Sequence, residues 1–104
     1  MATNAIARTT VDPYVIDTLM PDLVGHDRRP SAFLVYLYLW RRTSGGRARS
    51  DAISLRTIAE GTGVSKRAVQ NALRALTRRR LISASQSSPT AASTFIVHRP
   101  WARR

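Results

Sequence analysis

The sequence predicts a mainly α-helical fold with a small β-hairpin, and three observations lead to this class. Residues 54–80 repeat apolar positions with a helical period that is interrupted near Gly63. Residues 31–43 form an apolar run of helical length. Residues 81–98 contain two short β-branched segments separated by a turn rich in serine and threonine. A chain of 104 residues is long enough to build one core without a disulfide or a structural metal.

The centre of this prediction is a pair of helices joined by a tight turn at Gly63. Ser54 can cap the first helix, because its hydroxyl can accept a hydrogen bond from a free amide of the opening turn. Ala59 is small, so the backbones of two crossing helices can approach closely there. Glycine at position 63 permits a positive φ, which most residues adopt only with strain. We therefore expect helix, turn and helix in this order.

The second helix of the pair is expected to begin after Ser65, which can serve as its N-cap. An apolar stripe recurs every three or four residues on one face: Val69, Leu73 and Leu76. The other face carries side chains that can bind base edges: Lys66, Arg67, Gln70, Asn71 and Arg74. Arginine can bind guanine through two hydrogen bonds, and asparagine or glutamine can bind adenine in the same way. The alternative is a solvated helix face, but such a face normally includes acids, and residues 61–104 contain none.

The net charge of +11 is concentrated in the part of the chain that contains these helices. Residues 1–40 hold three arginines and four aspartates, which gives a net charge of −1. Residues 41–104 hold fourteen basic and two acidic residues, which gives +12. This distribution favours a polyanion such as nucleic acid as the partner. A membrane surface is disfavoured, because no helix combines a basic face with bulky apolar residues that lack a packing partner.

The N-terminal part predicts a short helix that begins with Asp12 as N-cap and Pro13 at the first helical position. Pro21 is expected to end or kink this helix, and residues 25–30 are expected to form a loop. The aspartates at positions 12, 17, 22 and 27 do not align on one helix face, so we interpret them as caps and loop residues. Ser31 can then cap the next helix, which extends to about Thr43.

The helix over residues 31–43 is apolar nearly all round. One face is expected to fill the core: Phe33, Leu34, Leu37 and Tyr38. A second apolar face must also be covered: Val35, Tyr36, Leu39 and Trp40. Either the N-terminal helix or a second subunit can cover it, and we expect a homodimer through the N-terminal helix and the helix around Trp40. The next segment, residues 44–51, is a flexible polar connection that contains Arg47 and Arg49, and residues 52–54 can add a very short strand.

From about residue 31 to 98, the chain resembles the winged helix-turn-helix DNA-binding domains of small bacterial transcriptional regulators, in particular MarR-like and GntR-like ones. The resemblance is carried by IAEGTGVSKRAVQNALRAL, residues 58–76, and by the strand start at Leu81 and Ile82. It implies a three-helix core plus an N-terminal helix. Residues 1–30 then form an arm and short helix available for dimerisation, and residues 31–104 form the winged domain. The positions that usually face DNA in this family are Ser65, Lys66, Arg67, Gln70, Asn71 and Arg74.

Arg78, Arg79 and Arg80 close the second helix of the pair. Cations at a helix C-terminus are stabilised by the macrodipole, and they can also hold phosphates beyond the groove. We include Arg78 among the expected DNA contacts. The expected wing tip departs from the family, because residues 85–93 contain no lysine or arginine. We therefore do not expect this wing to insert into the minor groove, although its hydroxyls can bind phosphates.

The sequence offers no support for an enzyme, a cofactor or a metal site. The chain has no cysteine, and its two histidines, His26 and His98, lack the spacing of metal ligands. No run is long enough to span a membrane, and the start lacks a secretory leader, so we expect a cytoplasmic protein. The leading expectation is sequence-specific binding of double-stranded DNA by a homodimeric transcriptional regulator. The alternatives are a winged-helix protein-interaction module and a plasmid or phage replication initiator.

Overall fold

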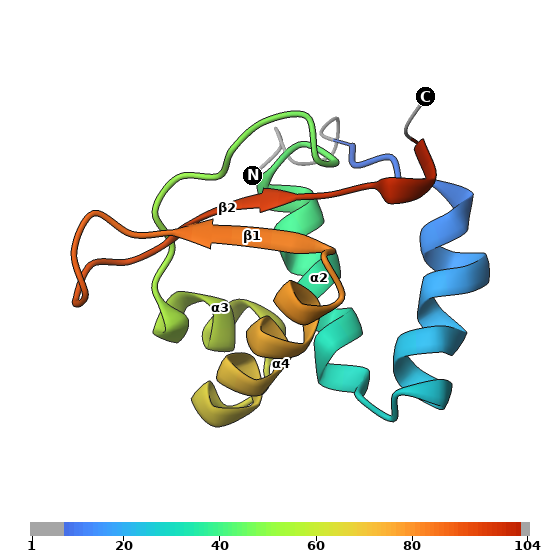
Figure 1. Cartoon of the computed structure of the whole chain (residues 1–104), viewed down its shortest axis with the longest axis horizontal. Coiled ribbons are helices and arrows are strands. Elements are labelled where there is room, and N and C mark those ends of the chain that lie inside the picture. Colours follow the sequence, from blue (N-terminus) through green and yellow to red (C-terminus); the bar gives the residue numbers. More distant parts are fainter. Residues whose placement is uncertain (1–7, 103–104) are drawn as a thin grey trace.

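The computed structural model describes residues 8–102, in which helices lead into a single β-hairpin (Figure 1). The elements in chain order are η1 (Val15–Leu19), η2 (Pro21–His26), α2 (Pro30–Arg42), α3 (Leu55–Thr62), α4 (Lys66–Arg78), β1 (Ile82–Ser85), β2 (Thr94–Val97) and η3 (Pro100–Ala102). The predicted fold class is confirmed: the chain is mainly helical with a small antiparallel hairpin, as in a winged helix-turn-helix. Residues 1–7 of the predicted arm and 103–104 of the predicted domain lie outside the described residues.

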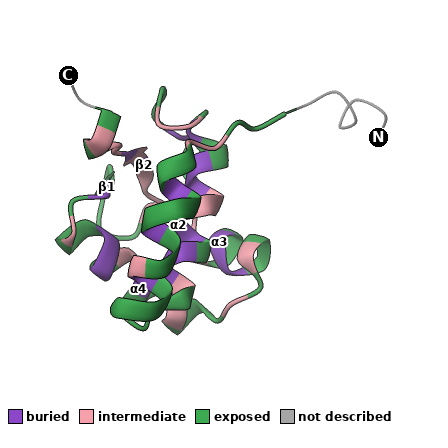
Figure 2. Cartoon of the chain, turned by 90° about the vertical axis from the view of Figure 1, so that its right-hand side faces the viewer, coloured by how far each residue is buried: buried purple, intermediate pink, exposed green. Residues whose placement is uncertain are grey.

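The central element is α2, which contacts η2, α3, α4 and β2. Figure 2 shows buried residues gathered where α2, α3 and α4 meet. The helix begins at Pro30, and neither its N-cap residue, Arg29, nor Ser31 caps it through a side chain. The predicted cap at Ser31 is therefore wrong, because proline already fits the first helical position, where no N–H is needed.

The buried face of α2 differs from the predicted one. Its buried residues are Ala32, Phe33, Val35, Tyr36, Leu39 and Trp40. Leu34, which we expected in the core, is 43% exposed, and Leu37 and Tyr38 are half-buried. Phe33 is buried as expected, whereas the assignment of Leu34 to the core is wrong. The side of Tyr36 and Trp40 is buried instead, because the two ends of the described chain cover it.

The face of α2 around Trp40 is covered by the chain itself. Nε1 of Trp40 donates a hydrogen bond to the carbonyl oxygen of Thr10 at 2.9 Å, and the ring of Trp101 stacks on Trp40 with centroids 6.5 Å apart. The hydroxyl of Tyr36 donates to the carbonyl oxygen of His98 at 2.9 Å, and burial raises the pKa of Tyr36. Trp40 is only 1% exposed. A second subunit is therefore not needed to cover this face, and that argument for a dimer through Trp40 is wrong.

Pro21 was expected to end or kink the N-terminal helix, and the helix does not end there. It starts at Pro13 as expected, but the Asp12 carboxylate accepts hydrogen bonds from Arg99 at 3.3 Å and Trp101 at 3.0 Å. From Val15 onward the hydrogen bonds have the longer π-helical spacing, as from the N–H of Met20 to the carbonyl of Val15. Pro21 is the first residue of the second π-helical segment and has no N–H to donate to the preceding turn. The helix thus reaches His26, and the predicted loop is shorter than expected.

This helix packs onto α2, and Val15, Leu19 and Leu23 lie in the common core. The predicted division of the chain at residue 30 stays a prediction. No helix within residues 8–102 has the length and apolar character needed to cross a bilayer.

The hairpin forms where the sequence predicts it. Strands β1 and β2 are antiparallel, with Ile82 opposite Val97 and Ser85 opposite Thr94. The predicted short strand before α3 is reduced to one bridge between Ile53 and Ser93. The preceding chain is also attached to β2, because the N–H of Ser50 donates to the carbonyl of Phe95 and the N–H of Phe95 donates to Oγ of Ser50, both at 2.9 Å.

Candidate nucleic-acid interface

The helix-turn-helix has the predicted caps and turn. Oγ of Ser54 accepts a hydrogen bond from the N–H of Thr57 at 3.0 Å, and Oγ of Ser65 accepts one from the N–H of Ala68 at 3.0 Å. Gly63 ends α3 with φ 84°. These residues determine where both helices start and where the chain bends, so the orientation of α4 depends on local sequence.

The inner face of α4 is held by the core, which leaves the opposite face exposed. The buried residues of α4 are Val69, Ala72, Ala75 and Leu76. Leu73 and the turn residue Val64 are only half-buried. Ile58 and Ala59 of α3 are buried, and the small Ala59 lies at the contact between the helices as expected. The apolar stripe therefore fixes which side chains of α4 point outward.

The structure exposes every residue that the sequence analysis proposed as a DNA contact: Ser65, Lys66, Arg67, Gln70, Asn71, Arg74 and Arg78. Nη1 of Arg74 donates a hydrogen bond to Oδ1 of Asn71 at 3.2 Å. Among residues 8–102, none of the four cations in this set forms an ion pair with a carboxylate. The set is thus a cationic surface on one side of α4, and DNA binding by these residues stays a prediction.

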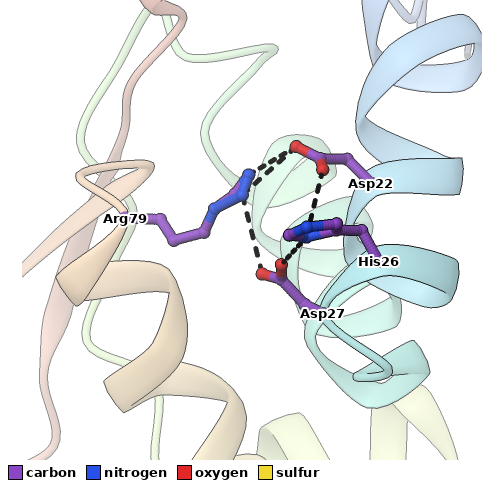
Figure 3. A network of polar contacts seen from close by, with 4 residues as sticks. All are labelled: Asp22, His26, Asp27 and Arg79. Atoms are coloured by element: carbon purple, nitrogen blue, oxygen red, sulfur yellow. Dashed lines mark hydrogen bonds and ion pairs between the residues drawn. The ribbon is translucent and has the colours of Figure 1, made fainter.

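Arg79 differs from its neighbours because it joins α4 to the N-terminal helix (Figure 3). Both terminal nitrogens of Arg79 donate to Oδ2 of Asp22, and Nη1 also lies 3.5 Å from Oδ2 of Asp27. Nδ1 of His26 lies 3.1 Å from Oδ1 of Asp27 and 3.9 Å from Oδ1 of Asp22. Arg79 is therefore a structural cation. The interpretation of Asp22 as a cap or loop residue is wrong, because its partner is distant in sequence.

The same cluster contains potential metal ligands, since ligand atoms of Asp22, His26 and Asp27 lie within 4.8 Å of one another. The guanidinium of Arg79 already pairs with both carboxylates and places a positive charge beside them. A cation at this point would have to displace Arg79, so the arrangement favours an ion-pair network over a metal centre.

Cations outside the helix-turn-helix also lie near α4. Arg28 and Arg29, which precede α2, line a hollow of about 180 Å³ together with Ala68 and Asn71. Arg28 and Arg29 were not predicted as part of this surface, because they are some forty positions away from Asn71 in the chain. A run of two arginines before a helix was their only signal in the sequence.

On the other side of α4, a hollow of about 350 Å³ separates the helix-turn-helix from the hairpin loop. Its lining includes Arg56 and Lys66 from the helices and Gln86 and Thr90 from the loop. Nε of Arg56 is bonded to Oε2 of Glu60 at 3.1 Å, whereas Lys66 has no such partner among the described residues. The helical side of this hollow is basic, since it carries Arg56 and Lys66.

The loop end of the hairpin carries a cation that was not assigned to it from the sequence. Nη1 of Arg49 lies 3.4 Å from Oγ of Ser85 and 3.5 Å from Oγ1 of Thr94. Arg49 belongs to the connection between α2 and α3, so only the folded chain brings it to the hairpin. The pattern of basic residues at 47 and 49 was visible in the sequence, but its neighbour was not.

Comparison with protein families supports a helix-turn-helix DNA-binding domain. A family model described as a helix-turn-helix domain matches residues 29–82, which is just over half of the chain. The match covers α2, α3 and α4 and ends at the start of β1. No curated protein and no solved structure matches the chain.

Proposed function

This chain belongs to the helix-turn-helix domain family, and we propose that it binds double-stranded DNA at a preferred sequence as a homodimeric transcriptional regulator. One observation carries the proposal: the outward face of α4 exposes Arg67, Gln70, Asn71 and Arg74, and no carboxylate within residues 8–102 pairs with its arginines. The proposal extends to a small bacterial regulator of the MarR-like or GntR-like kind, acting in the cytoplasm without enzymatic activity.

In this proposal the first half of α4 lies in the major groove. Arg67 is suited to guanine O6 and N7, and Gln70 and Asn71 are suited to adenine N6 and N7. Ser65 and Lys66, at the start of the helix, are placed to bind a phosphate, because the free amides and the helix dipole favour an anion there. Arg78 lies three turns further along and is assigned a phosphate beyond the groove.

Phosphate binding on both sides of α4 is supported by the surrounding charge. Arg28 and Arg29 lie beside Asn71 on one side, and the basic wall of the larger hollow lies on the other. Each phosphate contact releases counterions from the duplex and adds affinity that does not depend on sequence. The bases read by α4 would then supply the preference for one site over another.

The proposed dimer interface is an apolar stripe on the N-terminal helix, defined by Ile16, Met20 and Val24. These side chains are 44%, 36% and 38% exposed, and they are four positions apart. Figure 2 views the molecule from the side on which this helix lies in Figure 1. Such a row of exposed large apolar residues supports association with another protein surface. A two-fold dimer predicts an inverted-repeat site with half-sites about one helical turn apart.

Selection of binding sites from random duplexes tests the proposal most directly, because it reports binding, preferred sequence and symmetry together. Arg67→Ala and Gln70→Ala should then change the preferred bases, whereas Arg47→Ala, in the connection after α2, should not. If both α4 variants keep the original preference and bind strongly, the assignment of α4 to the groove is wrong.

Sedimentation at micromolar concentration tests the dimer. Met20→Asp should give a monomer, because it places a charge in the apolar stripe, while Thr18→Asp on the same helix adds the same charge outside the stripe and should leave the dimer intact. A monomeric wild-type protein at this concentration would remove the dimer and the inverted repeat from the proposal.

A protein-interaction module is the second candidate, and the exposed stripe of Ile16, Met20 and Val24 favours it. Salt dependence separates the two. Contact with about six phosphates gives a slope of log K against log salt of about −5, whereas docking through an apolar surface depends little on salt. A plasmid or phage replication initiator would also bind duplex DNA. Deletion of the gene for this chain would identify an initiator if it changed the copy number of the plasmid or phage genome rather than transcript levels.

A further inference from the structure

We propose that Arg49 supplies the wing with the positive charge that its own loop lacks and binds a backbone phosphate of the duplex. The wing is here the hairpin formed by β1, β2 and residues 86–93 between them. This inference rests on the proposed binding of duplex DNA and adds a residue that lies outside both the helix-turn-helix and the hairpin.

The guanidinium of Arg49 lies across the two strands where the hairpin loop begins. Ser85 ends β1 and Thr94 begins β2, so the two residues form the strand pair next to the loop, and their hydroxyl oxygens are 3.2 Å apart. Nη1 of Arg49 is within 3.5 Å of both hydroxyl oxygens. These contacts attach the arginine to both strands of the wing.

The backbone beside Arg49 is also attached to the wing. The next residue, Ser50, is buried and exchanges hydrogen bonds with the backbone of Phe95 in β2 through its N–H and its hydroxyl oxygen. Because Ser50 is fixed, Arg49 begins from a defined position on the hairpin. Binding through such a preorganised side chain loses less conformational entropy than binding through a free one.

The charge of Arg49 is not compensated by its surroundings. Residues 85–93 carry no charged side chain, and across the described part of the chain Arg49 forms no ion pair. Its bonds to the two hydroxyls are long and use only one of its nitrogens. The remaining N–H donors of this exposed side chain can bind an anion, and a guanidinium matches two phosphate oxygens at once.

The wing lies where it can meet a duplex held by α4. Gln86 and Thr90 of its loop face Arg56 and Lys66 across the hollow beside the helix-turn-helix. In Figure 1 the hairpin loop extends on the same side of the molecule as α3. Arg49 is not part of the lining of this hollow, because it contacts Ser85 and Thr94 on the face of the hairpin opposite to Phe95. The phosphate assigned to Arg49 is therefore one beside the loop end of the two strands, outside the hollow.

The test compares Arg49→Ala with Arg47→Ala, which removes the same charge two positions earlier in the same connection. Affinity is measured against salt for the selected duplex and for an unrelated duplex, and thermal unfolding checks that each variant folds. For Arg49→Ala we expect the slope of log K against log salt to shrink by about 0.9 on both duplexes. The ratio of wild-type to variant affinity should then change about eightfold for each tenfold change in salt concentration. Arg47→Ala should keep the wild-type slope, and Arg49→Lys should restore it.

A second variant, Ser85→Ala with Thr94→Val, removes both hydroxyls and should weaken binding in the same direction while Arg49 is retained. The inference is overturned if Arg49→Ala and Arg47→Ala behave alike while Arg67→Ala still weakens binding. It is also overturned if Arg49→Ala alters the preferred bases, since that would indicate a base contact. If the wild-type protein binds no duplex, the proposed function fails, and this inference fails with it.

Discussion

Arg79 and Arg78 are adjacent arginines with different environments, so alanine substitutions should separate stability from DNA binding. Both terminal nitrogens of Arg79 donate to Asp22, and Nη1 also approaches Asp27. A hydrogen bond between charged groups contributes about 1.5–3 kcal/mol when buried and well below 1 kcal/mol when exposed. Because the Arg79 side chain is 30% exposed, we take an intermediate value, and Arg79→Ala should lower the free energy of unfolding by about 1.5 kcal/mol.

For a domain of about this size, 1 kcal/mol corresponds to about 4–8 °C in Tm, so Arg79→Ala should lower Tm by about 6–12 °C. Urea or thermal unfolding, followed by circular dichroism, measures this loss. Arg78→Ala removes an equal charge from an exposed position and should change the free energy of unfolding by less than about 0.5 kcal/mol. In duplex binding the order should reverse: Arg78→Ala shrinks the salt slope by about 0.9, and Arg79→Ala does not.

A double-mutant cycle with Asp22→Ala adds an internal control for Arg79. If the ion pair is the cause, the second substitution should cost much less once the first is present. The reasoning would be refuted if the two arginine variants unfolded alike, or if Arg79→Ala reduced the salt slope as much as Arg78→Ala. Either result would mean that Arg79 is as free to meet a phosphate as Arg78 is.

Three other substitutions test the fold. Gly63→Ala should lower the free energy of unfolding by about 1 kcal/mol through its φ of 84° alone, because no neighbouring atom obstructs an added Cβ. Gly63→Asn should lower it less, since asparagine tolerates this φ better, and urea unfolding measures both. Equal losses for the two variants would contradict the backbone explanation. Trp101→Ala should lower the free energy of unfolding by about 2–3 kcal/mol and shift the fluorescence emission of Trp40, the one tryptophan left, to longer wavelength. An unshifted spectrum would mean that other residues keep Trp40 away from water. Burial raises the pKa of Tyr36 from 10.0, so the hydroxyl stabilises the fold below that pH and this contribution falls as pH rises above it. Tyr36→Phe should therefore be about 1 kcal/mol less stable than wild type at pH 7, because it loses the hydrogen bond to His98. This difference in the free energy of unfolding should narrow above pH 10.0, and a difference that stays constant with pH would refute the linkage.

Local features of the helix-turn-helix could be predicted because their causes lie within a few residues. A serine cap acts on the amide three positions later, and a glycine bend depends on its own φ, so Ser54, Gly63 and Ser65 were predictable from the sequence. The outward face of α4 followed in the same way from the spacing of Val69 and Leu76.

Features that depend on distant parts of the chain could not be predicted in this way. α2 is apolar on nearly every side, so its sequence does not identify the buried face; that face is set by Trp101 and the N-terminal helix. The continuation of that helix through Pro21 depends on a shifted hydrogen-bond register that hydrophobic spacing does not reveal. The partners of Arg79, Asp22 and Asp27, are more than fifty positions away, and those of Arg49 are 36 and 45 positions away, so the local sequence gives no signal of either.

The packing of Trp40 between Thr10 and Trp101 has a practical consequence for handling the protein. It brings the two ends of the described chain together beside the end of α2, whereas α4 begins on the opposite side of the molecule in both ribbon views. A dye or an immobilisation tether joined at an end of the described chain, residues 8–102, would lie on the side of the molecule opposite to the start of α4. Surface-based or fluorescence measurements of duplex capture can use such attachment points and leave the start of α4 accessible.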